Sequence, residues 1–175
     1  MKKLALLLTL VLGLTLTVQA QKIAYFDIET VLNQMPEMEQ AKAQMEKEQK
    51  ELANQLEELQ VEFNKKYKEY QDNMQLPDND PNKWSKTILQ YKEQELMDMQ
   101  NKIQQFQQTA SQTLQQRQVE LLQPVYAKLD SAVGVVAKQK GYIMVLKKDD
   151  VFYINSSKVD DITAEVKKIL GITKK

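Results

Sequence analysis

Two long stretches without internal glycine or proline flank one proline-containing turn, and this symmetry limits what the chain can fold into. The first stretch runs from Pro36 to Leu76 and the second from Trp84 to Pro124, with 41 residues in each. As helices they would each be about 60 Å long, at a rise of ~1.5 Å per residue. We therefore predict one helical hairpin that folds back about Asp80.

The first stretch carries a seven-residue repeat of apolar side chains. One heptad position holds Val31, Met38, Met45, Leu52 and Leu59, and a second holds Met35, Leu56, Phe63 and Tyr70. Lys42 and Gln49 interrupt the second series. The pattern indicates a coiled-coil seam with few apolar layers.

A hairpin about Asp80 makes a numerical prediction, because residues that meet should have numbers adding to about 160. Apolar residues satisfy this along the whole length: Met38 with Leu121, Met45 with Leu114, Leu56 with Ile103, Phe63 with Leu96, Tyr70 with Tyr91, and Met74 with Ile88. The sequence therefore favours an antiparallel pair over two helices that run to separate partners. A seam this thin would join the arms without making them rigid.

The segments around the hairpin predict short elements. Lys22 to Asp27 is typical of a strand, and a short helix capped by Asp27 or Thr30 should follow it through Leu32. Pro36 fits the first turn of the long helix, so we expect a break at residues 33–35, with a kinked continuous helix as the alternative. Helical periodicity continues through Pro124, where we expect a kink, and Gly141 should end that helix. Pro36 and Pro124 are the predicted hinges of the arm.

The C-terminal part predicts a small β-rich body. Tyr142–Leu146 and Val151–Ile154 are two β-rich runs, which residues 147–150 should join as a polar hairpin turn. A last helix, capped by Asp161, should end at Gly171. Apolar residues on both faces of these strands indicate self-association. The candidate oligomerisation residues are Ile23, Tyr25, Ile143, Val145, Val151, Phe152 and Tyr153.

The predicted fold class is α+β, predominantly α, with a long antiparallel helical-hairpin arm projecting from a small β-rich body. Residues 1–20 read as a cleaved secretory signal with basic Lys2 and Lys3, an apolar run, and a small-residue cleavage site ending at Ala20; the alternative is a membrane anchor. The body comprises residues 21–35 and 124–175, and the arm comprises residues 36–123 with its tip at 77–83. The signal predicts export to the periplasm.

Composition excludes most enzyme mechanisms. The chain has no cysteine and no histidine, so thiol nucleophiles, imidazole bases and the usual zinc or copper sites are absent. Asp78-x-Asp80-x-Asn82 resembles the start of a calcium loop, but Lys83 replaces the glycine that should follow. Without Lys2 and Lys3, 22 of the 24 basic residues remain against 24 acidic ones; this balance argues against nucleic-acid binding. We expect no catalytic residue, no metal and no cofactor.

The whole mature chain resembles the Skp/OmpH family of periplasmic chaperones, and its C-terminal end does so most specifically. The resemblance is carried by Lys22–Asp27, Pro36, Pro124 and the C-terminal segments Gly141–Leu146, Val151–Tyr153 and Asp161–Thr163. It implies a homotrimer whose three hairpins surround a cavity, and an ATP-independent holdase that keeps unfolded outer-membrane proteins from aggregating before insertion. Family members are often strongly basic, whereas this chain is near neutral. That departure argues against carrying over their contacts with membrane surfaces and lipopolysaccharide.

The candidate client-binding residues are the scattered tyrosine, methionine, leucine and tryptophan side chains toward the tip. They are Tyr67, Tyr70, Met74, Leu76, Trp84, Tyr91, Met97 and Met99. The pairing rule places Tyr70, Met74 and Tyr91 in the seam as the alternative, and Trp84 could instead close the hairpin against Leu76. The competing function is a structural coiled-coil adaptor of the cell envelope that binds one folded partner, and it leaves the thin seam unexplained.

Overall fold

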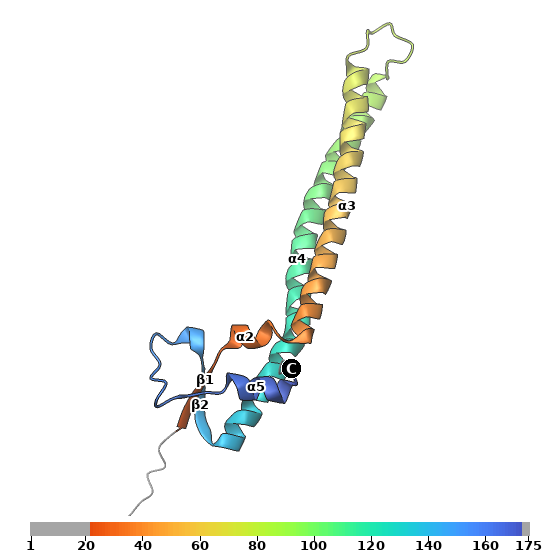
Figure 1. Cartoon of the computed structure of the whole chain (residues 1–175). Coiled ribbons are helices and arrows are strands. Elements are labelled where there is room, and N and C mark those ends of the chain that lie inside the picture. The colour runs from red at the N-terminus through yellow and green to blue at the C-terminus, as the bar shows by residue number, and fades with distance from the viewer. Residues whose placement is uncertain (1–21, 173–175) are drawn as a thin grey trace, which may run out of the picture. The chain divides into compact units, whose positions relative to one another are not determined.

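The computed structural model describes residues 22–172 (Figure 1). It divides into two compact units. We call the first unit, which contains residues up to Val31 and from Leu129 onward, the body. The second unit, Leu32–Lys128, is the arm. The predicted signal at residues 1–20 lies outside the described residues.

The body contains a three-stranded parallel sheet with β1 (Lys22–Phe26) at its centre. The outer strands are β2 (Tyr142–Lys147) and β3 (Asp160–Asp161), and both pair with β1 in parallel. In this register Ala24 lies beside Val145 on one side and Asp160 on the other. Because side chains alternate along a strand, Ala24 and Phe26 face the core, and both are buried.

The helical part of the body core comes from the end of α4 (Lys86–Lys140) and from α5 (Thr163–Leu170). Its buried side chains are Leu129, Ala132 and Val136 on α4 and Val166 on α5, joined by Ile162 just before α5 and by Val31. Helix α5 ends at Gly171, whose φ of 72° is left-handed, as the sequence predicted. The Asp161 carboxylate accepts a hydrogen bond from the Thr163 backbone N–H at 2.9 Å, although the N-cap position itself is Ile162.

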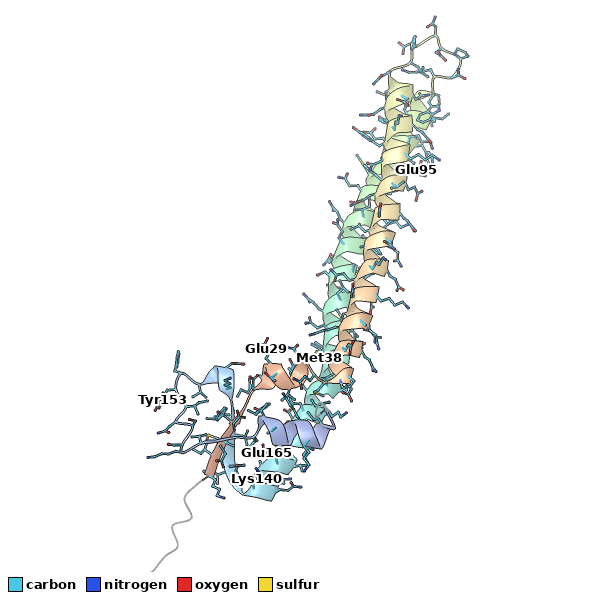
Figure 2. All side chains as sticks on the ribbon, in the orientation of Figure 1. Glu29, Met38, Glu95, Lys140, Tyr153 and Glu165 are labelled. Carbon is cyan, nitrogen blue, oxygen red and sulfur yellow. The ribbon has the colours of Figure 1, made fainter. Side chains whose placement is uncertain are left out.

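The predicted β-hairpin is wrong. β2 ends at Lys147, a 3₁₀ turn η1 covers Lys148–Asp150, and residues 151–154 form no strand. The third strand is instead β3, a short acidic segment. Strand propensity at Val151–Ile154 cannot act without a neighbouring strand that offers hydrogen-bond partners. Phe152 and Tyr153 are accordingly exposed, and Tyr153 is labelled in Figure 2.

The long helices confirm the predicted hairpin. Helix α3 (Pro36–Met74) and the first part of α4 run antiparallel and side by side in Figure 1. Short helix α2 (Ile28–Leu32) precedes them, and the predicted break at residues 33–35 is confirmed, with Pro36 in the first turn of α3. The Asp27 carboxylate caps α2 by accepting from the Thr30 N–H at 2.8 Å.

Helix α4 stays helical through Pro124 and ends at Lys140. Gly141 follows with a φ of 73°, which agrees with its predicted role in ending the helix. At the tip, both helices are shorter than predicted, because α3 stops at Met74 and α4 starts only at Lys86. The connecting loop therefore includes Leu76 and Trp84, which lie at the two ends of the predicted turn.

Candidate functional site: the helical arm

The seam between α3 and α4 is thin, as predicted. The half-buried apolar side chains that recur along it are Met45, Leu52, Leu56, Leu59, Phe63 and Tyr70 on α3, and Leu89, Met99, Ile103, Phe106, Ala110 and Leu114 on α4. In the fully described stretch between residues 42 and 124, Leu96 is the only apolar side chain that is buried. Little apolar area therefore holds the middle of the arm together.

A polar groove lies along the seam toward the Pro36 end of the arm. It has a volume of about 630 Å³ and is lined by Gln44, Lys47, Glu48, Glu51, Thr113, Gln116, Arg117 and Glu120. Arg117 spans it, with its Nε 3.2 Å from Glu48 Oε2 on the opposite helix. Partly exposed ion pairs of this kind contribute little to stability. An ion pair thus adds to the few apolar contacts that join the two helices here.

An ionic cluster lies in the seam nearer the tip. Lys66 of α3 pairs with Glu95 of α4, and Lys92 Nζ lies 3.1 Å from the other Glu95 oxygen; Glu95 is labelled in Figure 2. The hydrogen bond from Lys66, followed by that from Lys92, lowers the pKa of Glu95. The same bond with Glu95 raises the pKa of Lys66. Both groups stay charged near neutral pH, so the cluster fixes which residues of the two helices meet.

The ion pairs between α3 and α4 add to a number close to the predicted sum near the tip and are offset from it toward Pro36. The numbers of Lys66 and Glu95 add to 161, close to the predicted 160. Those of Glu48 and Arg117, and of Glu37 and Lys128, both add to 165. This difference amounts to about one helical turn. The single sum therefore described the hairpin correctly but not the register at its base.

The loop at the tip is held by Asn73, a polar residue with an exposed fraction of only 7%. Its Nδ2 donates to the Asn82 carbonyl at 2.9 Å, and its Oδ1 accepts from the Trp84 N–H at 2.9 Å. Lys83 Nζ donates to the Leu76 carbonyl at 2.6 Å and to the Met74 carbonyl at 3.0 Å, so it satisfies the end of α3. The tip is therefore an ordered turn built around one buried amide.

The predicted client-binding residues separate into two groups. Tyr70, Leu76, Trp84 and Met99 are half-buried, whereas Tyr67, Met74, Tyr91 and Met97 are exposed. The pairing rule was wrong for Met74 and Tyr91, which are 49% and 68% exposed. Lys92 Nζ lies 5.6 Å from the centre of the Trp84 ring, which is within the range of a cation–π contact.

Sequence reasoning missed the polar members of the seam. Lys66 and Asn73 continue the heptad series of Leu52 and Leu59 at the same seven-residue spacing. Counting only apolar side chains ended the series too early. It also missed Val61, Val119 and Tyr126, which are 61%, 65% and 41% exposed, since exposure on a helix depends on the register of its neighbour.

Within residues 22–172, no helix is both long and apolar enough to cross a membrane. The same residues hold no group of three or more acidic side chains arranged to bind a metal ion.

The fold has a solved counterpart. A protein of Caulobacter crescentus CB15 described as OmpH-like shares it with a TM-score of 0.70, and the match covers 85% of this chain and 82% of that one at 15% identity. The architecture is thus that of a helical-hairpin protein with a small sheet.

The sequence comparisons identify the family. Residues 22–170 match the model of the family "Outer membrane protein (OmpH-like)". Two proteins named chaperone protein Skp, from Pectobacterium atrosepticum and Yersinia enterocolitica, are each 31% identical to the chain; each match covers 92% of this chain and 93% of the relative. The chain belongs to the OmpH-like family.

Proposed function

We propose that this protein is a periplasmic chaperone that binds unfolded outer-membrane proteins and prevents their aggregation before insertion. Membership of the family, together with the chaperone name of its relatives, supports this function over that of a structural adaptor. Binding and release need no nucleotide hydrolysis, because weak contacts at many points can release a client spontaneously. The chain would reach the periplasm through the signal at residues 1–20.

The exposed apolar side chains of the arm are the observation that carries the proposal. Tyr67, Met74, Tyr91 and Met97 are each more than 40% exposed on a helical pair that does not use them in its own seam. Unbranched methionine adapts to many partner shapes, which suits a protein that must accept many sequences. Several such contacts within one cavity act together through high effective concentration.

The cavity requires several arms, and we propose that three copies assemble through the body. Ile143 and Met144 of β2 are 60% and 50% exposed, and Phe152 and Tyr153 are 111% and 79% exposed. Apolar side chains gathered on one small unit in this way favour burial against another protein surface. The trimeric number comes from the family resemblance.

An aggregation assay tests the proposal. A urea-unfolded outer-membrane protein is diluted out of urea with and without the purified protein, and light scattering is followed. We expect scattering to be suppressed, and we expect Tyr91→Ser with Met97→Ser to weaken the suppression. The matched control is Gln90→Ser with Gln100→Ser, two exposed positions on the same helix. Unchanged scattering with the unmodified protein would refute the chaperone function.

A further inference from the structure

An uncharged stripe runs along one side of α4 from the middle of the arm toward the body. Its members follow each other at alternating spacings of four and three residues, so they lie on one face of the helix. They are Gln105, Thr109, Gln112, Gln116, Val119, Gln123 and Tyr126, and all seven are exposed. We call this set the glutamine stripe.

The glutamine stripe contrasts with the neighbouring helix. Residues 103–116 of α4 contain no charged side chain. Residues 45–62 of α3, which lie along the same part of the arm, contain six glutamates and two lysines. The arm therefore has an acidic helix and a neutral helix at the same height, and the two present different chemistry to a partner.

We propose that the glutamine stripe is the surface along which the arm holds an extended segment of unfolded polypeptide. This inference rests on the proposed chaperone function and names a second surface of the arm, beside the exposed apolar side chains, that takes part in it. An unfolded chain exposes backbone N–H and C=O groups whatever its sequence. A glutamine amide is both donor and acceptor, so a row of them can pair with such groups without selecting a sequence. Gln116 Nε2 already donates to Glu120 Oε1 at 2.9 Å, so the pairing falls mainly to Gln105, Gln112 and Gln123.

The dimensions of the stripe suit this occupant. Gln105 to Tyr126 spans 21 residues of helix, or about 32 Å at ~1.5 Å per residue. An extended chain rises ~3.3 Å per residue, so roughly ten client residues can lie along it. Val119 and Tyr126, at 65% and 41% exposure, add apolar contacts at the end nearer the body.

Two other occupants fit the stripe less well. A second helix would need apolar residues at two positions of every heptad, and the stripe has only Val119 and Tyr126. A membrane surface attracts amphipathic helices through lysine and arginine, and the stripe has neither. The absence of charge also admits acidic and basic clients equally, whereas the acidic face of α3 would repel acidic ones.

A photo-crosslinking residue introduced into the full-length protein tests the assignment. It replaces Gln112 in the stripe or, as a control, Gln104, an exposed glutamine about two turns nearer the tip and rotated by about 80° around the helix. The probe is a urea-unfolded outer-membrane protein diluted into buffer. We expect the yield of client crosslinks at Gln112 to exceed that at Gln104 by at least about fivefold, the ratio for roughly 1 kcal/mol of preference. Equal yields would overturn the proposal.

A charge-placement pair gives an independent readout. Gln105→Glu with Gln112→Glu adds two charges to the stripe, and Gln104→Glu with Gln118→Glu adds the same charges elsewhere on α4. We expect only the first pair to raise the chaperone concentration needed for half-suppression of aggregation, by about threefold or more. Circular dichroism confirms that both variants remain helical. Equal effects of the two pairs would also overturn the stripe.

The outcomes separate this inference from the function on which it rests. If the unmodified protein does not suppress aggregation, the chaperone function itself fails. If it suppresses aggregation while stripe and control variants behave alike, only the stripe is wrong. If Gln112 crosslinks to another copy of the chain when no client is present, the occupant of the stripe is a second copy and the proposal is wrong. If Gln112 crosslinks to phospholipid vesicles, the occupant is a membrane surface and the proposal is likewise wrong.

Discussion

Asn73 gives the sharpest test of how the tip is built, because its buried side chain makes two hydrogen bonds from the end of α3 to the loop before α4. Asn73→Ala removes the hydrogen bonds to the Asn82 carbonyl and the Trp84 N–H, both 2.9 Å long. Each bond contributes about 0.5–1.5 kcal/mol, so the tip should lose about 1–3 kcal/mol of local stability. Water can reach the loop and replace part of that, which favours the lower half of the range.

Trp84 makes this loss measurable, since it is the only tryptophan in the chain. Urea unfolding followed by Trp84 fluorescence reports the tip, while far-ultraviolet circular dichroism reports the helices as a whole. In Asn73→Ala we expect the fluorescence transition to move to lower urea more than the dichroism transition does. Amide exchange at Trp84 should accelerate by about 5- to 150-fold for the same loss of 1–3 kcal/mol.

The matched control for this experiment is Asn79→Ala, an exposed asparagine of the same loop. It changes the same side chain at the tip without touching the ties to Asn82 and Trp84. If the two variants shift Trp84 fluorescence and exchange equally, the tip is not held by the Asn73 amide, and the reasoning fails.

Other parts of the structure make separate predictions. Hydrogen bonds lower the pKa values of four carboxyl groups, those of Asp27, Glu37, Glu95 and Glu165. The stability that these groups add is present above their ordinary pKa and should be lost as the pH falls below about 4.5. A thermal midpoint that stays constant down to pH 3 would contradict this. Burial, and then the hydrogen bond to Asp160, raises the pKa of Tyr142 to about 12. The stability that the protonated Tyr142 adds should therefore be lost between about pH 10 and 12. Urea unfolding should show that Tyr142→Phe removes this loss, whereas the control Tyr126→Phe keeps it. The double variant Lys66→Met with Glu95→Leu replaces an ion pair in the seam by apolar residues and should raise the melting temperature. Lys66→Met alone leaves Glu95 without this partner and should lower the melting temperature. A double variant that melts below the single variant would show that the pair is not part of the seam. Phe152→Asp should dissociate the assembly in sedimentation while Asp149→Asn does not, and an unchanged sedimentation coefficient would count against assembly through the body.

The hairpin could be predicted because its causes are local. Two stretches without internal glycine or proline, a heptad repeat and a turn between Pro77 and Pro81 all act within the chain that carries them. The same holds for Pro36, Gly141 and Gly171, whose backbone preferences appear where the sequence placed them.

The sheet could not be predicted fully, because strand pairing depends on residues that are distant in sequence. Val151–Ile154 has higher strand propensity than Asp160–Asp161, yet the acidic segment pairs with β1. The backbone of Asp161 enters the sheet while Ile162, beside it, is fully buried. Burial of Ile162, which directly precedes α5, therefore determines which segment forms the third strand more than strand propensity does.

The polar residues in the seam explain how the arm can be long and thin and still keep one register. Apolar packing alone would allow the two helices to slide, since most of its layers are only half-buried. Lys66 with Glu95, Arg117 with Glu48, and the Asn73 ties at the tip join particular positions along the arm. Polar pairs of this kind specify register while adding little stability. The arm therefore needs few apolar residues for its own seam, so side chains such as Tyr91, Met97 and Val119 remain on the surface, where a client can reach them.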